Sequence, residues 1–138
     1  MNFWKDKKIL ITGFEGFLGS SLTKKLLKSK AKVMGLDIKT FREETILCSQ
    51  DYKKMVVYNG SVTNYSLLKK ILRTHSINVI FHLAAEAIVG RGQKNPRRAF
   101  ESNIAGTWEV LEAARLQGDM QAIVVASSDK AYGSHKKL

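Results

Sequence analysis

The chain has 138 residues, of which 44% are hydrophobic, so it can form one domain with a real core but not two. Its formal net charge is +11, from 23 Lys and Arg against 12 Asp and Glu. The basic residues are spread over predicted helix faces and do not form one stripe with interleaved aromatics, which argues against a nucleic-acid-binding protein. The excess positive charge instead favours a phosphorylated small-molecule ligand.

The sequence gives no indication of a membrane or secreted protein. Lysines precede an apolar run near the N-terminus, but Thr12, Gly13 and Glu15 interrupt that run too early for a signal peptide. No apolar stretch approaches the length of a transmembrane helix. Cys48 is the only cysteine, so no intrachain disulfide can form and a reducing compartment suits the chain. We therefore expect a cytoplasmic protein.

Short apolar segments alternate with amphipathic segments along the chain. The first apolar segment, residues 7–12, predicts a strand that ends in a glycine turn, and residues 16–30 predict a helix. The same criteria predict further strands at 31–37, 54–60, 77–85 and 121–128, and further helices at 63–76 and 95–118. The least patterned stretch, residues 40–52, is expected to be a surface connection.

The predicted strands scarcely alternate between apolar and polar residues, which is typical of parallel strands that are buried on both faces. Helices are predicted between most of them. The sequence therefore predicts an α/β fold, a Rossmann-like, doubly wound parallel sheet of about five strands with helices on both faces.

The most informative motif is TGFEGFLGS, which lies between the first predicted strand and the first predicted helix and carries glycines at 13, 16 and 19. Glycines at such a junction permit a tight turn and let the backbone approach a pyrophosphate. They also allow close contact between helix and strand, and the helix N-terminus offers N–H groups and the positive end of its dipole. The motif predicts a dinucleotide site.

An acidic residue, Asp37, ends the second predicted strand eighteen residues after Gly19. A carboxylate at this place accepts hydrogen bonds from the adenosine ribose and repels a 2′-phosphate, so the cofactor is expected to be NAD in preference to NADP. Lys39 and Arg42 lie close enough in sequence to weaken that preference.

Several segments together resemble the extended short-chain dehydrogenase/reductase superfamily, in particular the nucleotide-sugar epimerases and dehydratases. They follow the family's order over nearly the whole chain: TGFEGFLGS, Asp37, NGSVTN (59–64), FHLAAEAIVG (81–90), NPRRAFESNIAGTWEVLEAAR (95–115) and VVASSDKAYG (124–133). The resemblance implies a nucleotide-sugar substrate in the full-length parent, whose sugar hydroxyl is oxidised by hydride transfer to NAD and later re-reduced. It does not separate epimerase from dehydratase.

The resemblance also implies which residues contact the cofactor. Those expected at the pyrophosphate are Gly13, Gly16, Phe17, Leu18 and Gly19, and those at the adenosine ribose are Asp37 and Ile38. Ser61 and Val62 would lie beside adenine, where the family usually has aspartate in place of Ser61, so the hydrogen bond to the adenine amino group is expected to be weaker.

Three small or apolar residues, Leu83, Ala84 and Ala85, are expected along the middle of the cofactor and its nicotinamide ribose, where bulk would collide with the ligand. Asn103 matches a family position close to the cofactor. An alternative for Asn103 is that its side chain satisfies backbone groups within its own helix.

The expected catalytic residues follow the fifth predicted strand. Ser128 matches the family's serine or threonine that hydrogen-bonds the reacting sugar hydroxyl or ketone, and it lies where ligands bind open α/β sheets. Asp129 and Lys130 match the positions of an acid and a glutamate base in related dehydratases. Lysine in the second place departs from that pattern, and it transfers protons only if its pKa is depressed.

Tyr132 and Lys136 have the spacing of a catalytic tyrosine–lysine pair but are interpreted as a chance match. Gly133 would weaken a helix there, and only two residues follow Lys136 to propagate one. In the family, the catalytic pair comes roughly two dozen residues after the serine, whereas here the gap is four. The resemblance makes Tyr132 a structural residue.

From this resemblance we expect residues 1–138 to form an incomplete NAD(P)-binding Rossmann domain that lacks the catalytic tyrosine–lysine pair and the C-terminal substrate domain. Such a chain would bind the cofactor without turnover. Its fifth strand would leave Ile123, Val124 and Val125 near an open edge, so a homodimer is possible. The alternative is a non-catalytic module that senses a dinucleotide or binds another protein.

Other conspicuous side chains are assigned structural roles. His82 is expected to be a core histidine with satisfied hydrogen bonds, and His75 to cap a helix. Trp4 and Trp108 are expected to be packing residues, and Glu86 a solvated side chain.

Overall fold

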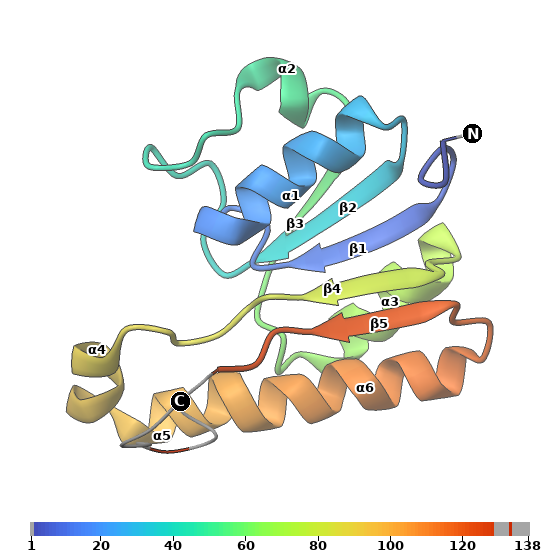
Figure 1. Cartoon of the computed structure of the whole chain (residues 1–138). Coiled ribbons are helices and arrows are strands. Elements are labelled where there is room, and N and C mark those ends of the chain that lie inside the picture. The colour runs from blue at the N-terminus through green and yellow to red at the C-terminus, as the bar shows by residue number, and fades with distance from the viewer. Residues whose placement is uncertain (1, 129–132, 134–138) are drawn as a thin grey trace.

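The computed structural model describes residues 2–128 and 133, and its centre is a parallel sheet with the strand order β3-β2-β1-β4-β5 (Figure 1). The strands are β1 (Lys8–Thr12), β2 (Lys32–Asp37), β3 (Val56–Asn59), β4 (Val79–His82) and β5 (Ala122–Val125). All four neighbouring pairs are parallel. The chain builds outward from β1 to β3 and then crosses to the other side of β1, which places a topological switch point between β1 and β4.

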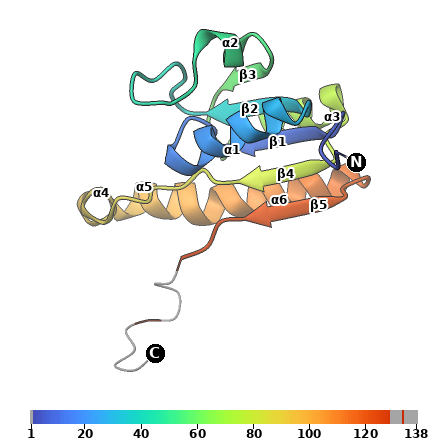
Figure 2. The same ribbon diagram turned by 45° about the horizontal axis from the view of Figure 1, so that its top comes forward.

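Helices cover both faces of this sheet, with α1 and α2 on one side and α3 and α6 on the other (Figure 2). The helical segments are α1 (Phe17–Lys28), α2 (Ser49–Tyr52), α3 (Tyr65–His75), α4 (Val89–Lys94), α5 (Pro96–Phe100), the π-helical turn η1 (Glu101–Ala105) and α6 (Gly106–Gln117). The predicted doubly wound, Rossmann-like α/β fold is confirmed.

Two hydrophobic clusters hold the layers together, because successive strand side chains point to opposite faces. Leu10 of β1 and Ile80 of β4 face α3 and α6 and pack with Leu68, Ile71 and Val110 of those helices. Their neighbours in sequence point the other way and join the second cluster, whose members include Ile9, Ile11, Val33, Val79, Phe14 and Leu26. Apolar residues at consecutive positions of β1 and β2 are therefore buried on both faces of the sheet.

Polar side chains define several helix ends. The side chain of Asn64 accepts a hydrogen bond from the backbone N–H of Leu67 at the start of α3, and Ser76 ends that helix in a left-handed conformation. Asn95 caps α5 in the same way as Asn64 caps α3 and is followed by Pro96 in the first turn.

The structure differs from the sequence-based elements in several places. The strands predicted at 77–85 and 121–128 are shorter and end at His82 and Val125. Residues 95–118 do not form one α-helix, because η1 separates α5 from α6, and α4 and α2 were not expected. Both α2 and α4 are short, and α4 contains Gly90 and Gly92, so neither has the apolar periodicity that predicts a helix. None of the helices that the structure describes is long and apolar enough to span a bilayer.

Candidate functional site

The glycine motif forms the turn between β1 and α1, at the carboxyl edge of the sheet. Gly13 has a φ of +70°, and a Cβ on it would lie 2.8 Å from the backbone nitrogen of Ala84 beyond β4. Gly16 is the N-cap of α1. A Cβ on Gly19 would overlap the carbonyl oxygen of Gly13, so α1 approaches the turn this closely only because Gly19 lacks a side chain.

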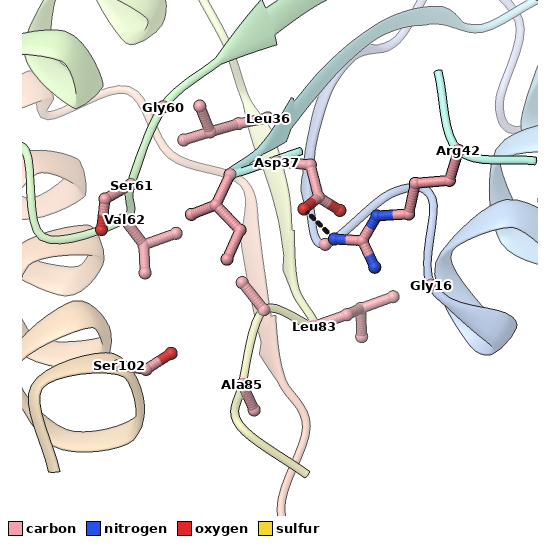
Figure 3. Close-up of a pocket in the computed structure, with 13 residues that line it drawn as sticks. Gly16, Leu36, Asp37, Arg42, Gly60, Ser61, Val62, Leu83, Ala85 and Ser102 are labelled. Carbon is pink, nitrogen blue, oxygen red and sulfur yellow. Dashed lines mark hydrogen bonds and ion pairs between the residues drawn. The ribbon is translucent and has the colours of Figure 1, made fainter. Parts of the chain in front are cut away.

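A pocket of about 140 Å³ opens beside this turn (Figure 3). It lies between the turn, the ends of β2, β3 and β4, and the π-helical turn. Its lining residues are Gly13, Gly16, Leu36, Asp37, Ile38, Arg42, Gly60, Ser61, Val62, Leu83, Ala84, Ala85 and Ser102. The pocket therefore sits at the switch point, where ligands of open parallel sheets bind.

The carboxylate of Asp37 is buried at the end of β2 and forms an ion pair with Arg42, with 2.5 Å between Oδ1 and Nη2 (Figure 3). Nε of Arg42 donates a second hydrogen bond to the carbonyl oxygen of Lys39, at 3.1 Å. The guanidinium thus lies in the pocket wall beside the acid that was expected to bind a ribose.

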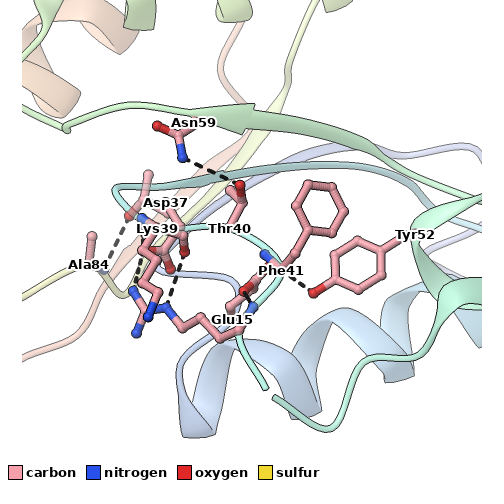
Figure 4. A network of polar contacts seen from close by, with 10 residues as sticks. Glu15, Asp37, Lys39, Thr40, Phe41, Tyr52, Asn59 and Ala84 are labelled. Atoms are coloured by element: carbon pink, nitrogen blue, oxygen red, sulfur yellow. Dashed lines mark hydrogen bonds and ion pairs between the residues drawn. The ribbon is translucent and has the colours of Figure 1, made fainter. Parts of the chain in front are cut away.

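Glu15, inside the glycine motif, is 3% exposed and holds the loop after β2 in place (Figure 4). Its carboxylate accepts hydrogen bonds from the backbone N–H groups of Phe41 and Arg42, at 2.6 and 2.8 Å, and from the hydroxyl of Tyr52 at 2.7 Å. Burial and the neighbouring carboxylate raise the pKa of Tyr52, which therefore stays a hydrogen-bond donor. Phe41 has a φ of +60°, a conformation that these bonds help to maintain.

A second network, buried at Thr12 and His82, joins the ends of β1 and β4 to the π-helical turn. Nδ1 of His82 lies 2.7 Å from Oγ1 of Thr12, and Nε2 lies 3.0 Å from Oγ1 of Thr107. The Thr107 hydroxyl donates to the carbonyl oxygen of Asn103, so it accepts from Nε2–H of His82. His82 is then the neutral Nε2–H tautomer, and Nδ1 accepts from the Thr12 hydroxyl. Burial also lowers the pKa of His82, which favours this neutral form.

Asn103 belongs to the same network, because its carbonyl oxygen accepts a hydrogen bond from the hydroxyl of Thr107. Its side chain accepts a hydrogen bond from the backbone N–H of Glu86 at 2.7 Å and donates one to the Glu86 carbonyl oxygen at 3.2 Å. Through these two hydrogen bonds, the π-helical turn holds the backbone of the loop after β4 at Glu86. π-Helical turns in α-helices are frequent at functional sites.

A second cavity, of about 510 Å³, continues from the pocket past Leu83, Ala84 and Ala85. Asn103, Thr107 and Ser128 are among its other lining residues. The expected catalytic serine thus shares a cavity wall with the residues expected beside the nicotinamide end of the cofactor. Asp129, Lys130, Tyr132 and Lys136 lie outside the described residues.

Comparison with known proteins places this arrangement in a family. The family model for GDP-mannose 4,6 dehydratase matches residues 10–138. The chain belongs to this family. The resemblance to nucleotide-sugar epimerases and dehydratases is thereby confirmed.

Relatives of the GDP-mannose 4,6 dehydratase family include both kinds of enzyme. CDP-glucose 4,6-dehydratase of Salmonella typhimurium is 30% identical over 98% of this chain and 38% of its own length. The solved UDP-glucose 4-epimerase of Thermotoga maritima, crystallised with UDP-glucose, is 27% identical with a TM-score of 0.82, covering 95% of this chain and 41% of that one. MoeE5, solved with UDP-glucuronic acid and NAD, is 26% identical with a TM-score of 0.78. The match covers 93% of this chain and 39% of the MoeE5 chain. The chain spans about two fifths of the length of these relatives.

The structure brings most of the expected cofactor residues together in this family member. All of them line the first pocket except four: Phe17, Leu18, Gly19 and Asn103. Gly19 is buried under the turn, Leu18 is 60% exposed at the start of α1, and Phe17, 96% exposed, borders an adjoining cavity. Asn103 bonds the backbone of the loop after β4 instead of backbone groups in its own helix.

The structure confirms only some of the structural roles that the sequence analysis expects for histidine and tryptophan side chains. His82 is a buried core histidine with both ring nitrogens bonded, as expected. His75 ends α3, but its ring contacts the hydroxyl of Tyr58, and Ser76 is the C-cap. Trp4 packs against the ring of Phe81, whereas Trp108 is 57% exposed and was wrongly expected to be a packing residue.

The roles of Glu15, Thr12 and Thr107 were not found from the sequence. Their partners are distant in the chain, so no local spacing indicates them. The only signal for Glu15 is an acid within a glycine turn that was expected to approach an anion. Among the described residues, no group of three or more His, Cys, Asp or Glu side chains is placed to hold a metal ion.

Proposed function

We propose that this chain is the dinucleotide-binding part of a nucleotide-sugar epimerase or dehydratase. The observation that carries the proposal is that the glycine turn, Asp37 and the backbone after β4 line one pocket at the switch point of the sheet. Family membership and the NAD in the solved MoeE5 complex support a nicotinamide dinucleotide as the ligand.

The glycine turn is suited to the pyrophosphate of such a cofactor. A Cβ at Gly13 would meet the backbone of Ala84, so this approach of strand and loop exists only with glycine. Gly16 is the N-cap of α1, whose first turn contains no acidic residue, so the positive end of the helix dipole would face the pyrophosphate uncompensated. Phe17 and Leu18 would contribute backbone N–H groups, and Gly19 the close helix contact.

The rest of the pocket is assigned to the adenosine and the nicotinamide ribose. Asp37 and Ile38 would contact the adenosine ribose, and Ser61 and Val62 would flank adenine. Leu83, Ala84 and Ala85 leave room for the middle of the cofactor. The Asp37 carboxylate by itself favours NAD over NADP, because it repels a 2′-phosphate.

The chemistry assigned to the full-length parent is oxidation and re-reduction of a sugar hydroxyl. A nicotinamide dinucleotide supplies the hydride acceptor and donor when it is bound. Ser128, at the carboxyl end of β5, would hydrogen-bond the reacting sugar oxygen, and Asp129 and Lys130 would exchange protons with the sugar. The chain by itself is expected to bind cofactor without turnover, because it spans only about two fifths of the length of the enzymes that it resembles. The exposed Val124 and Val125 of β5 make a homodimer a further proposal.

Titration of the chain with NADH, followed by nicotinamide fluorescence, tests this function. Saturable binding is expected, and Ala85→Leu should abolish it because Ala85 is exposed and lines the pocket. Ala122→Leu is the matched control, since Ala122 is also exposed but begins β5 at the opposite end of the sheet. No fluorescence change at about millimolar NADH, or equal loss in both variants, would exclude the proposed function.

A further inference from the structure

The guanidinium of Arg42 is placed where a dinucleotide would present its adenosine ribose. It borders the first pocket together with Asp37, and its two assigned hydrogen bonds use two of the five N–H groups of a guanidinium. Within the part of the chain that the structure describes, three N–H groups of Arg42 are left for a ligand. A planar guanidinium with such donors is well suited to phosphate oxygens.

The charge of Asp37 is offset by this contact. An unpaired carboxylate repels a 2′-phosphate, but the ion pair with Arg42 is buried on the Asp37 side, where the acid is 6% exposed. The repulsion on which an NAD preference depends is therefore reduced. Arg42 itself is 31% exposed and accessible to a ligand.

Further positive charge lies next to Arg42. An adjoining cavity of about 700 Å³ shares Gly16, Ile38 and Arg42 with the first pocket and is also bordered by Lys39, Arg91 and Arg98. Two acids border this cavity, Glu15 and Glu44. The carboxylate of Glu15 is occupied by hydrogen bonds from the loop and from Tyr52, so the ligand-facing charge is predominantly positive.

Glu15 determines where Arg42 stands. It binds the backbone N–H of Arg42 and of the preceding Phe41, while the Arg42 side chain binds the Lys39 carbonyl oxygen and Asp37. The residue is thus held at its backbone and along its side chain. Preorganisation of this kind lowers the entropic cost of binding a ligand.

We infer that this pocket accepts the 2′-phosphate of NADP, with Arg42 as the residue that binds it and Glu15 as the positioning residue. The inference rests on the proposed function and revises its cofactor preference. NADP is expected to bind at least as tightly as NAD, in spite of the acid at the end of β2. A doubly charged phosphate beside three unused guanidinium donors gains charge-assisted hydrogen bonds that a ribose hydroxyl does not.

Isothermal titration of the whole chain with NAD and, separately, with NADP tests this assignment. Arg42→Ala should lower the NADP affinity about ten- to a hundredfold relative to any change in NAD affinity, the usual effect of losing charge-assisted bonds. Arg115→Ala removes the same charge from α6, where Arg115 pairs with Glu112, and should leave the ratio of the two affinities unchanged.

The positioning role of Glu15 is tested by the ratio of NADP to NAD affinity in a Glu15 variant. Glu15→Gln keeps the size of the side chain but replaces one carboxylate oxygen by an amide, so Arg42 is held less firmly. The ratio of NADP to NAD affinity should fall, whereas a merely structural defect would weaken both cofactors equally. Tyr52→Phe, which removes only the third bond to Glu15, provides a second variant if Glu15→Gln melts below the assay temperature.

The outcomes separate the two proposals. If NAD binds and NADP binds measurably more weakly than NAD, the 2′-phosphate assignment is wrong and the proposed function stands. An unchanged affinity ratio in Arg42→Ala also overturns the assignment. If neither dinucleotide binds, both proposals fail.

Discussion

Oγ1 of Thr12 and Nδ1 of His82 lie 2.7 Å apart, although the two residues are seventy positions apart in sequence. Thr12 ends β1 and His82 ends β4, so this bond joins the two strands at the switch point. The Thr12 oxygen also accepts the backbone N–H of Ala84, at 3.2 Å. The Thr12 hydroxyl therefore holds both the imidazole of His82 and the backbone of Ala84, which lines the pocket.

Thr12→Val should destabilise the fold, because it keeps the shape of the side chain but removes the hydroxyl. Nδ1 of His82 and the N–H of Ala84 would lose their partner in a buried place. We expect the free energy of unfolding in urea to fall by about 1–3 kcal/mol. Thr74→Val, on the exposed side of α3, is the control and should change it by less than about 0.5 kcal/mol. Equal effects of the two substitutions would contradict the network.

His82 should make stability depend on pH below neutrality. Burial lowers its pKa in the folded state below the ordinary value of 6.5, so below that pH the unfolded chain binds a proton that the folded chain does not. The free energy of unfolding should therefore fall as the pH drops from about 6.5 toward the folded-state pKa, by up to about 1.4 kcal/mol per pH unit.

Comparison with His82→Asn isolates this contribution, since the other titrating groups are common to both proteins. Urea unfolding at about pH 7.5 and about pH 5.5 should show a smaller difference in the variant than in the parent chain. The same pH dependence in both proteins would show that His82 is protonated equally in the folded and unfolded states.

Gly19→Ala should damage the glycine turn more than a change at an open glycine. The added Cβ would overlap the carbonyl oxygen of Gly13 and come 2.8 Å from Cα of Phe14, and both are backbone atoms that cannot rotate away. The loss in the free energy of unfolding is expected to be at least about 2 kcal/mol, with a lower melting temperature in calorimetry.

Gly90→Ala is the matched control for that substitution. Nothing lies within 4 Å of a Cβ at Gly90, which is in the short helix α4, and alanine there should be neutral or slightly stabilising. If Gly19→Ala melts at the same temperature as Gly90→Ala, α1 does not approach the turn as closely as described.

The site was only partly predictable from the sequence. TGFEGFLGS and Asp37 identified the turn and the acid, because chain order alone places them at the carboxyl edge of a parallel sheet. The π-helical turn was not predicted, since its residues continue the helical pattern on both sides. Asn103 was assigned to the site with an alternative inside its own helix, and its actual partner, the backbone of Glu86, lies in another segment.

The sequence by itself determined the order of the five strands along the chain, the existence of the longer helices between them and the place of the glycine turn, because these depend on the spacing of apolar residues and on the conformations open to glycine. Only the tertiary structure decided that Glu15 supports the loop of Arg42, that Arg42 neutralises Asp37, and that His82 is bonded on both sides. Hydrogen bonds and ion pairs require atoms within a few ångströms in a particular direction, and for residues far apart in the chain that geometry exists only once the layers have packed.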